Sequence, residues 1–365
     1  MNICICGGGS LGHVIAGKIA SYGEHVSILT RRPEQWRKSL IIDDCKGESI
    51  SGKIQNISDN PSDIIPLADI VLLCLPGFAM ESELQLIQPY LKSDCYVGSV
   101  VCCTGFFFIA YKILRKGTPL FGFQRAPYIA RVKEYGKSAH LLGYKKELQI
   151  ATVHISAPAS LQTYLQKVLD TPVRLLNHFL EASLTNSNPL LHPARLYGLF
   201  HLWKEGESFS VPPTFYKTWD NKSSQLLIDC DKEFHDILSA LPVKIAQIPT
   251  ILDYYDSYDA ESLTQKIRSI EAFKGILAPM QKFDSGYIPD FSSRYFQEDI
   301  PFGLLIIKSI AEILKVNTPY IDKVLNWAQS MIGKHYLIDG HLSGSDLIGT
   351  GHVSAELFFQ LIKDN

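Results

Sequence analysis

The segment N-I-C-I-C-G-G-G-S-L-G at residues 2–12 is the strongest indication of fold in this chain. Residues 3–6 are apolar, as in a buried strand, and residues 11–20 continue with mostly small and apolar side chains, as in a packed helix. Between them, Gly7, Gly9 and Gly12 have the spacing G-x-G-x-x-G. A strand, this turn and a helix together predict a dinucleotide-binding βαβ unit.

Each glycine of this motif has its own expected function. Gly7 permits the tight turn, Gly9 lets the backbone approach a pyrophosphate, and Gly12 lets the helix pack on the strand. The first backbone N–H groups of the helix, at Ser10 and Leu11, are then free to bind phosphate. An ordinary glycine-rich turn is the alternative, and the flanking strand and helix favour the cofactor site.

The end of the second predicted strand bears on cofactor choice. NAD-preferring proteins usually carry an acidic residue there, which accepts a hydrogen bond from the ribose 2′-hydroxyl. This chain has Thr30, Arg31 and Arg32 instead. Guanidinium groups suit a 2′-phosphate, so NADP(H) is the predicted cofactor and NAD(H) the alternative. In the less specific interpretation, both arginines are solvated surface charges.

Short apolar runs alternate with helical patterns over the first part of the chain, which predicts a doubly wound parallel sheet. The expected strands are residues 2–6, 25–30, 69–75, 96–102 and 119–124. Ligands of such sheets bind beyond the carboxyl ends of the strands, which makes Pro76 a candidate cofactor contact. Residues 138–144 and 148–153 are β-prone and should extend the sheet or form a hairpin.

Helical periodicity takes over from about residue 178. The expected fold class is therefore α/β, with a Rossmann domain at residues 1–177 and a mostly α-helical substrate domain at residues 178–365. Aromatic residues mixed with Asp, Ser, Gly and Pro at 254–258 and 283–291 predict loops beside a cleft.

Composition restricts the class of protein. The chain has 365 residues, 46% hydrophobic residues and a formal net charge of −2, which suits a two-domain enzyme with substantial cores. Near-neutral charge disfavours nucleic acid, and no apolar run is long enough to span a bilayer. Because the first residues form a strand rather than a signal peptide, a cytoplasmic location is expected.

The eight cysteines do not form a metal motif. Five of them fall in predicted buried strands: Cys4, Cys6, Cys74, Cys102 and Cys103. No C-x-x-C occurs, and a metal at Cys4 and Cys6 would lie beneath the sheet. The cysteines are expected to be small core residues, and no metal site is predicted.

Two polar clusters in the second half of the chain are candidates for chemistry. Asn188 and His192 are four residues apart and share a helix face. More than a hundred residues later, Arg294 and Asp299 precede an apolar helix. Taken singly, His192 could be a core histidine and Asp299 a helix-dipole partner.

Taken together, these clusters resemble the opine dehydrogenases of the octopine/nopaline type. The resemblance rests on N-x-x-x-H-P at residues 188–193 and R-x-x-x-E-D-I-P-F-G-L at residues 294–304, both with unbroken spacing. It implies NAD(P)H-dependent reductive condensation of an amino acid with an α-keto acid through an imine. It also implies that His192 and Asp299 are catalytic, that Asn188 lies in the active site, and that Arg294 holds a substrate carboxylate.

Residue chemistry agrees with these implied roles. Imidazole exchanges protons near neutral pH, a neighbouring carboxylate orients the ring, and arginine binds carboxylates through two hydrogen bonds. The alternatives are a 2-dehydropantoate-reductase-like or 6-phosphogluconate-dehydrogenase-like NADP enzyme using a lysine such as Lys204 or Lys217, and a non-catalytic nucleotide sensor. The expected partners are small-molecule substrates, and a homodimer remains a hypothesis.

Overall fold

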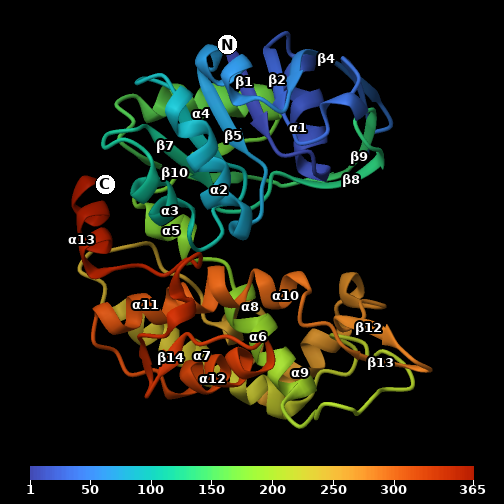
Figure 1. The fold of residues 1–365 in the computed structure, drawn as a ribbon, viewed down its shortest axis with the longest axis vertical. Coiled ribbons are helices and arrows are strands. Elements are labelled where there is room, and N and C mark those ends of the chain that lie inside the picture. Colours follow the sequence, from blue (N-terminus) through green and yellow to red (C-terminus); the bar gives the residue numbers. More distant parts are fainter. The chain divides into compact units, whose positions relative to one another are not determined.

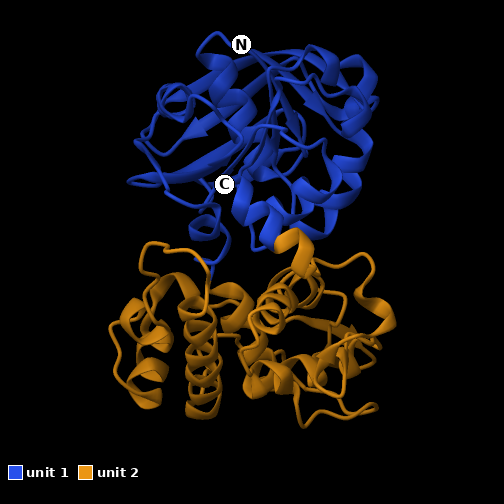
Figure 2. Ribbon diagram, turned by 90° about the vertical axis from the view of Figure 1, so that its left-hand side faces the viewer, with its two compact units in different colours: residues 1–186, 359–365 blue, residues 187–358 orange.

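The computed structural model describes residues 1–365, which fall into two compact units (Figure 2). Unit 1 comprises Met1–Asn186 and Phe359–Asn365, and unit 2 comprises Ser187–Phe358. The boundary between the units, after Asn186, lies nine residues beyond the boundary at 177/178 expected from the sequence, and the last residues of the chain belong to unit 1. The expected functional boundary stays a prediction.

Unit 1 is built on an eleven-stranded sheet in the order β11-β10-β7-β6-β5-β1-β2-β4-β3-β9-β8. Figure 1 shows these strands in blue to green, with helices around them. The strands are β1 Asn2–Cys6, β2 His25–Leu29, β3 Ser39–Asp44, β4 Ser49–Ser58, β5 Ile70–Leu73, β6 Tyr96–Ser99, β7 Leu120–Phe123, β8 Tyr128–Glu134, β9 Ser138–Tyr144, β10 Leu148–Val153 and β11 Val173–Leu175.

The centre of this sheet is parallel, from β7 through β6, β5, β1 and β2 to β4. Antiparallel strands extend it on both sides: β10 pairs with β7, β3 pairs with β4, and β8 forms a hairpin with β9. The five expected strands are therefore confirmed to within a few residues, as is the extension by residues 138–153. Strands β3, β4 and β11 were not expected.

The helices of unit 1 are α1 Ser10–Ser21, α2 Gly77–Ile87, α3 Phe106–Ile113, α4 Pro158–Leu169 and α5 Phe179–Ser183. Helices α1 and α4 cover one face of the sheet. Val14 and Ile15 of α1 and Leu161 of α4 belong to one buried cluster with Ile3 and Ile5 of β1. Because strand side chains alternate, Cys4 and Cys6 point to the opposite face, where their sulfurs lie 3.9 Å apart.

Burial of the cysteines only partly follows expectation. Cys4 and Cys6 are buried within β1, as expected. Cys102 is buried but follows β6, and Cys74 and Cys103 also follow their strands and are half-buried. The placement of these three cysteines inside strands was therefore wrong.

Unit 2 is mostly helical, as expected. Its helices are α6 Asn188–Phe200, α7 Asn221–Ser239, α8 Ile251–Tyr254, α9 Ala260–Ser269, α10 Arg294–Gln297, a π-helix at Ile300–Leu304, α11 Leu305–Ile313 and α12 Pro319–Met331, and α13 Ala355–Asp364 begins in it. It also holds two small hairpins, β12 Met280–Phe283 with β13 Gly286–Pro289, and β14 Leu337–Ile338 with β15 His341–Leu342. Residues 283–291, expected to be a loop, thus include β13, which pairs with β12 through backbone hydrogen bonds.

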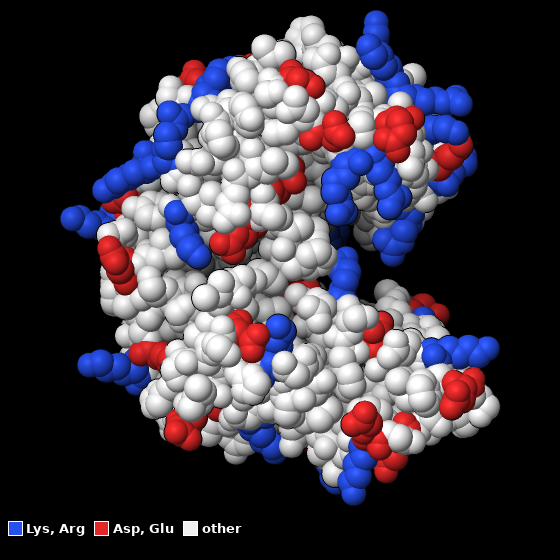
Figure 3. Space-filling model, in the orientation of Figure 1, with Lys and Arg blue, Asp and Glu red and all other residues white.

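Acidic and basic side chains are interspersed over the face of the molecule shown in Figure 3. No helix combines the length and apolar character needed to cross a membrane.

Candidate active site

The glycine motif forms the turn between β1 and α1, and its three glycines differ in their surroundings. Gly7 has a φ of +115°, and a Cβ there would lie 2.7 Å from the carbonyl oxygen of Cys74. A Cβ on Gly12 would lie 2.0 Å from the carbonyl oxygen of Gly7. A Cβ on Gly9 would meet nothing within 4 Å. Gly7 and Gly12 are therefore required by the fold, whereas Gly9 leaves space open to a ligand.

A buried histidine holds this turn in place through both of its ring nitrogens. His13 follows Gly12 on α1, and its Nδ1 lies 2.9 Å from the carbonyl oxygen of Gly9. Its Nε2 accepts a hydrogen bond of 2.7 Å from the backbone N–H of Gly136, and its ring stacks on Trp36 at 4.2 Å. Burial lowers the pKa of His13, which favours the neutral ring that this pattern of bonds requires. The glycine loop is thereby tied to the β8–β9 turn.

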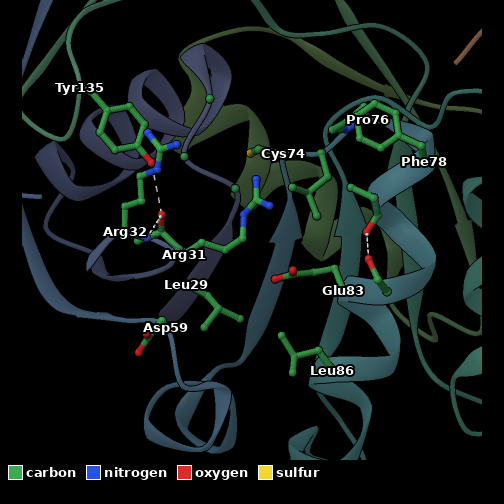
Figure 4. A pocket seen from close by; sticks show the side chains of 17 residues that line it. Leu29, Arg31, Arg32, Asp59, Cys74, Pro76, Phe78, Glu83, Leu86 and Tyr135 are labelled. Carbon is green, nitrogen blue, oxygen red and sulfur yellow. Dashed lines mark hydrogen bonds between the residues drawn. The ribbon is translucent and has the colours of Figure 1, made fainter. Parts of the chain in front are cut away.

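A cavity of about 500 Å³ lies along this loop at the carboxyl ends of β1, β2 and β5 (Figure 4). Its lining includes Gly7, Gly9, Thr30, Arg31, Arg32 and Pro76, all of which had been predicted as cofactor contacts. The remaining predicted contacts, Ser10, Leu11 and Gly12, do not line it. The hydroxyl of Ser10 instead accepts a hydrogen bond from the backbone N–H of Val132.

Several lining residues were missed from the sequence. Tyr135 lies in the β8–β9 turn and places its hydroxyl 3.4 Å from Oγ1 of Thr30. Asp59 follows β4, and Glu83 comes from α2. In Figure 4, the side chains of Arg31 and Glu83 point toward one another across the cavity. Burial raises the pKa of Glu83, while the charge of Arg31 opposes the rise.

These features fit a dinucleotide. The space left by Gly9 admits a pyrophosphate beside the start of α1, and the cavity has the volume of a cofactor pocket. Arg31 and Arg32 are exposed at one side of the cavity, where a ribose phosphate could accept their hydrogen bonds. Leu29 and Leu86 supply apolar surface for a base.

In unit 2, the two clusters singled out in the sequence meet. His192 on α6 and Asp299, just before the π-helix, form a hydrogen bond of 2.8 Å between Nδ1 and Oδ2. Their side chains are 12% and 14% exposed, so both are largely desolvated but still within reach of a small molecule. Because a carboxylate only accepts, Nδ1 donates, and Nε2 of the neutral ring is the acceptor.

A close backbone contact explains how these distant segments meet. A Cβ on Gly303 would lie 2.9 Å from Cβ of Pro189, so glycine lets the π-helix pack directly on the first turn of α6. The π-helix begins one residue after Asp299, and π-turns often mark functional sites. Pro189 and Gly303 of the two motifs thus set the position of His192 relative to Asp299.

The other nitrogen of His192 has a partner that the sequence did not indicate. Its Nε2 lies 3.1 Å from the hydroxyl of Tyr216. The rings of Tyr295 and Phe215 pack edge-on to the imidazole, with centroids at 4.7 and 5.7 Å. By sequence alone, Tyr216, Trp219 and Tyr254 could line an amine pocket or belong to the core, with the core favoured. The structure buries Tyr216 and Trp219 and leaves Tyr254 exposed.

The two predicted substrate contacts are both accessible. Asn188 is exposed on the first turn of α6, one turn before His192. Arg294 is exposed at the start of α10, and its guanidinium has no hydrogen-bond or ion-pair partner. Their contacts with substrate remain predictions.

Residues 124–131 carry two arginines that could contact an anion or another part of the protein, and the structure gives one of them a structural role. Gln124 donates to the hydroxyl of Thr185 at 3.1 Å, and Arg125 donates to the carbonyl oxygen of Thr185 at 3.0 Å. No group of three or more His, Cys, Asp or Glu side chains is arranged to hold a metal ion.

Comparisons with known proteins agree with this architecture. The family model described as NAD/NADP octopine/nopaline dehydrogenase, alpha-helical domain, matches residues 175–332, and a ketopantoate reductase model matches residues 3–103. The octopine dehydrogenase of Mizuhopecten yessoensis is 32% identical, covering 96% of this chain and 94% of its own length. The tauropine dehydrogenase of Arabella iricolor is 32% identical, covering 95% and 96%. A solved octopine dehydrogenase in complex with NADH and agmatine superposes with a TM-score of 0.85 at 30% identity, covering 100% of this chain and 98% of that one.

Proposed function

The chain belongs to the NAD/NADP octopine/nopaline dehydrogenase family, and we propose that its reaction is the reductive condensation of an amino acid with an α-keto acid. The enzyme is an NAD(P)-dependent oxidoreductase that acts on C–N bonds. The hydrogen-bonded pair of His192 and Asp299 is the observation that carries the proposal, because imine formation requires a group that exchanges protons near neutral pH.

His192 and Asp299 would divide the chemistry between them. Asp299 accepts from Nδ1, which orients the ring and stabilises the imidazolium when it forms. The proton of the imidazolium then serves to remove the carbinolamine oxygen as water. When bound in the cavity of unit 1, the nicotinamide cofactor supplies the hydride that reduces the imine.

Arg294 is proposed to bind the keto acid. Its exposed guanidinium, free of internal partners, can donate two parallel hydrogen bonds to a carboxylate. Arg294→Ala should therefore raise the KM for the keto acid by about tenfold or more while leaving the affinity for the cofactor unchanged. Measured KM values for both compounds check this. An active variant with an unchanged keto acid KM would contradict the role.

NADP(H) is the proposed cofactor. The octopine dehydrogenase structure contains NADH, so family membership alone is compatible with either nucleotide. Arg31 and Arg32 on the cavity support a preference for the 2′-phosphate, whereas Glu83 and Asp59 lower the positive potential there. The ratio of kcat/KM for NADPH and NADH, measured for the wild type and for Arg31→Ala, tests this. Loss of a preference for NADPH in the variant is the expected result.

The decisive experiment measures NAD(P)H oxidation with pyruvate, with and without a pool of amino acids, for the wild type and His192→Ala. Oxidation that needs both substrates and disappears in the variant supports condensation. Oxidation by keto acid alone would instead favour a hydroxy-acid dehydrogenase, the function of the family whose model covers only residues 3–103. Cytoplasmic location and homodimer formation stay predictions.

A further inference from the structure

We propose that His192 exchanges protons with the substrate through the hydroxyl of Tyr216, which makes Tyr216 a catalytic residue. This role rests on the proposed function. The starting observation is that both ring nitrogens of His192 are engaged: Nδ1 with Asp299 at 2.8 Å, and Nε2 with the Tyr216 hydroxyl at 3.1 Å.

The direction of these bonds follows from the chemistry of the groups. Nδ1 donates to the carboxylate, so Nε2 of the neutral ring offers a single lone pair, and the Tyr216 hydroxyl donates to it. A substrate can use Nε2 directly only if Tyr216 withdraws. Otherwise, it must pass its proton through the Tyr216 oxygen.

The packing of Tyr216 opposes withdrawal. The residue is only 6% exposed, and its ring stacks on Phe273 with centroids 4.1 Å apart and planes inclined by 17°. It also lies parallel to Trp219 and packs against the edge of Phe215. Moving the hydroxyl away from His192 would break this stack, since side chains in a close-packed interior have few alternative rotamers.

A buried arginine holds the backbone of the same loop. Arg195 lies three residues after His192 on α6 and is 1% exposed. Its Nε donates to the carbonyl oxygen of Phe215 at 2.7 Å, and its Nη2 donates to the hydroxyl of Thr218 at 2.8 Å. One guanidinium thus connects the helix that carries His192 with the loop that carries Tyr216, and it acts as a positioning group.

The hydroxyl remains protonated in the working range of the enzyme. Burial raises the pKa of Tyr216, and the neighbouring Tyr295, Tyr255 and Asp299 add to the rise. Tyr216 therefore acts as a donor that gives one proton as it receives another, and not as a phenolate base.

The proposed transfers balance. An ammonium proton of the amino acid passes to the Tyr216 oxygen while the Tyr216 proton passes to Nε2. The free amine then attacks the keto carbon, the C–N bond forms, and a proton moves from nitrogen to oxygen to give a neutral carbinolamine. Finally, Tyr216 protonates the carbinolamine oxygen and regains a proton from Nε2. The C–O bond breaks, water leaves, and the nitrogen lone pair completes the iminium.

Tyr216→Phe is the direct test, because it removes the hydroxyl and keeps the ring in its stack. The expected result is a fall in kcat of about 10²-fold, the usual contribution of a positioned acid–base group, with little change in either substrate KM. In mixtures of H2O and D2O, the wild-type rate should depend on deuterium fraction along a curve, since two protons move together. The residual rate of the variant should change linearly.

An unchanged or increased kcat in Tyr216→Phe would contradict the proposed role. If Tyr216 merely covers Nε2, the variant exposes that nitrogen and its kcat equals or exceeds that of the wild type, which overturns the proposal. Tyr197→Phe, a hydroxyl deletion on α6 at a ring that stacks on His201, is the control and should keep kcat unchanged. Tm and NAD(P)H affinity report whether each variant is folded.

If Tyr216→Phe does not fold, 3-fluorotyrosine at position 216 preserves the packing and makes the hydroxyl more acidic. Its kcat should then differ from that of the wild type, and an identical kcat overturns the role.

The experiments distinguish a failure of the Tyr216 role from a failure of the proposed function. Condensation by the wild type that is lost in His192→Ala but kept in Tyr216→Phe rejects only the Tyr216 role, whereas absence of condensation in the wild type rejects both.

Discussion

At the scale of single residues, the cofactor loop shows that identical amino acids can be required for different reasons. Gly12 is required by the folded chain itself, because the backbone of Gly7 occupies the space that a methyl group would need. Gly9 has open space and a φ of −80°, a conformation that alanine adopts freely. The fold would therefore accommodate a methyl group at residue 9, and the lack of a side chain there leaves space for a ligand.

This difference gives a matched pair of variants. Gly12→Ala should lower the free energy of unfolding by roughly 2–3 kcal/mol, as overpacking does, and lower Tm accordingly. Gly9→Ala should leave Tm nearly unchanged but weaken NAD(P)H binding by at least about tenfold, because its methyl group enters the space for the pyrophosphate. Thermal unfolding without cofactor and titration with NAD(P)H check both. A Gly9→Ala protein with normal affinity would contradict the assignment.

At the scale of elements, α5 depends on an unusual N-cap. His178 precedes this helix, and its Nδ1 accepts a hydrogen bond of 3.2 Å from the backbone N–H of Leu180. Its Nε2 is buried without a partner, and burial lowers the pKa of His178 to about 4. The cap therefore needs the neutral ring, because a protonated Nδ1 could not accept.

This cap makes stability depend on pH in a defined direction. The unfolded chain takes up the His178 proton below its ordinary pKa of about 6.5, whereas the folded chain does so only near pH 4. Between these values, falling pH costs up to about 3 kcal/mol of stability, and above pH 7 the histidine has no effect. His178→Asn keeps a capping oxygen that does not titrate, so denaturant unfolding of this variant should lose less stability from pH 7 to pH 5. Equal losses in both proteins would refute the assignment.

At the scale of the whole molecule, unit 1 is not a continuous segment of chain. Residues Phe359–Asn365 return to it. Asp364 accepts a hydrogen bond of 2.6 Å from the hydroxyl of Tyr111, and the side chain of Asn365 accepts one of 3.0 Å from the backbone N–H of Phe179. Leu361 is fully buried. The carboxyl-terminal end of α13 is therefore a part of the cofactor-binding unit.

Two substitutions on this helix end test that assignment. Leu361→Ala should lower the stability of unit 1 by about 2–4 kcal/mol, whereas Lys363→Ala at an exposed position should change it by less than about 0.5 kcal/mol. The relevant transition is the one that added NAD(P)H moves to higher temperature, since a ligand stabilises the unit that binds it. An unchanged transition in Leu361→Ala would show that unit 1 does not depend on this segment.

Local patterns were sufficient for the parts of the protein that form from neighbouring residues. The β1–glycine loop–α1 unit, the apolar strands β5 to β7 and the helical character of unit 2 each follow from spacing within a few residues. Strand β4 escaped prediction because its exposed face carries the polar residues Ser51, Lys53 and Gln55, and only two of its residues are buried. A strand of this kind is stabilised by its neighbours in the sheet more than by its own composition.

The chemistry of the site required the folded chain. His192 and Asp299 were recognised from motif resemblance, but their hydrogen bond spans 107 residues of sequence and is supported by the close packing of Gly303 on Pro189. From the sequence, Tyr216 could be either a pocket or a core aromatic, and its contact with His192 could not be predicted. Glu83 had no sequence signal as a site residue, because a helix carboxylate looks the same on any surface. Which distant residues meet in the fold depends on which apolar surfaces pack against one another. Since no short window of sequence contains both partners, such a pair cannot be predicted from local patterns.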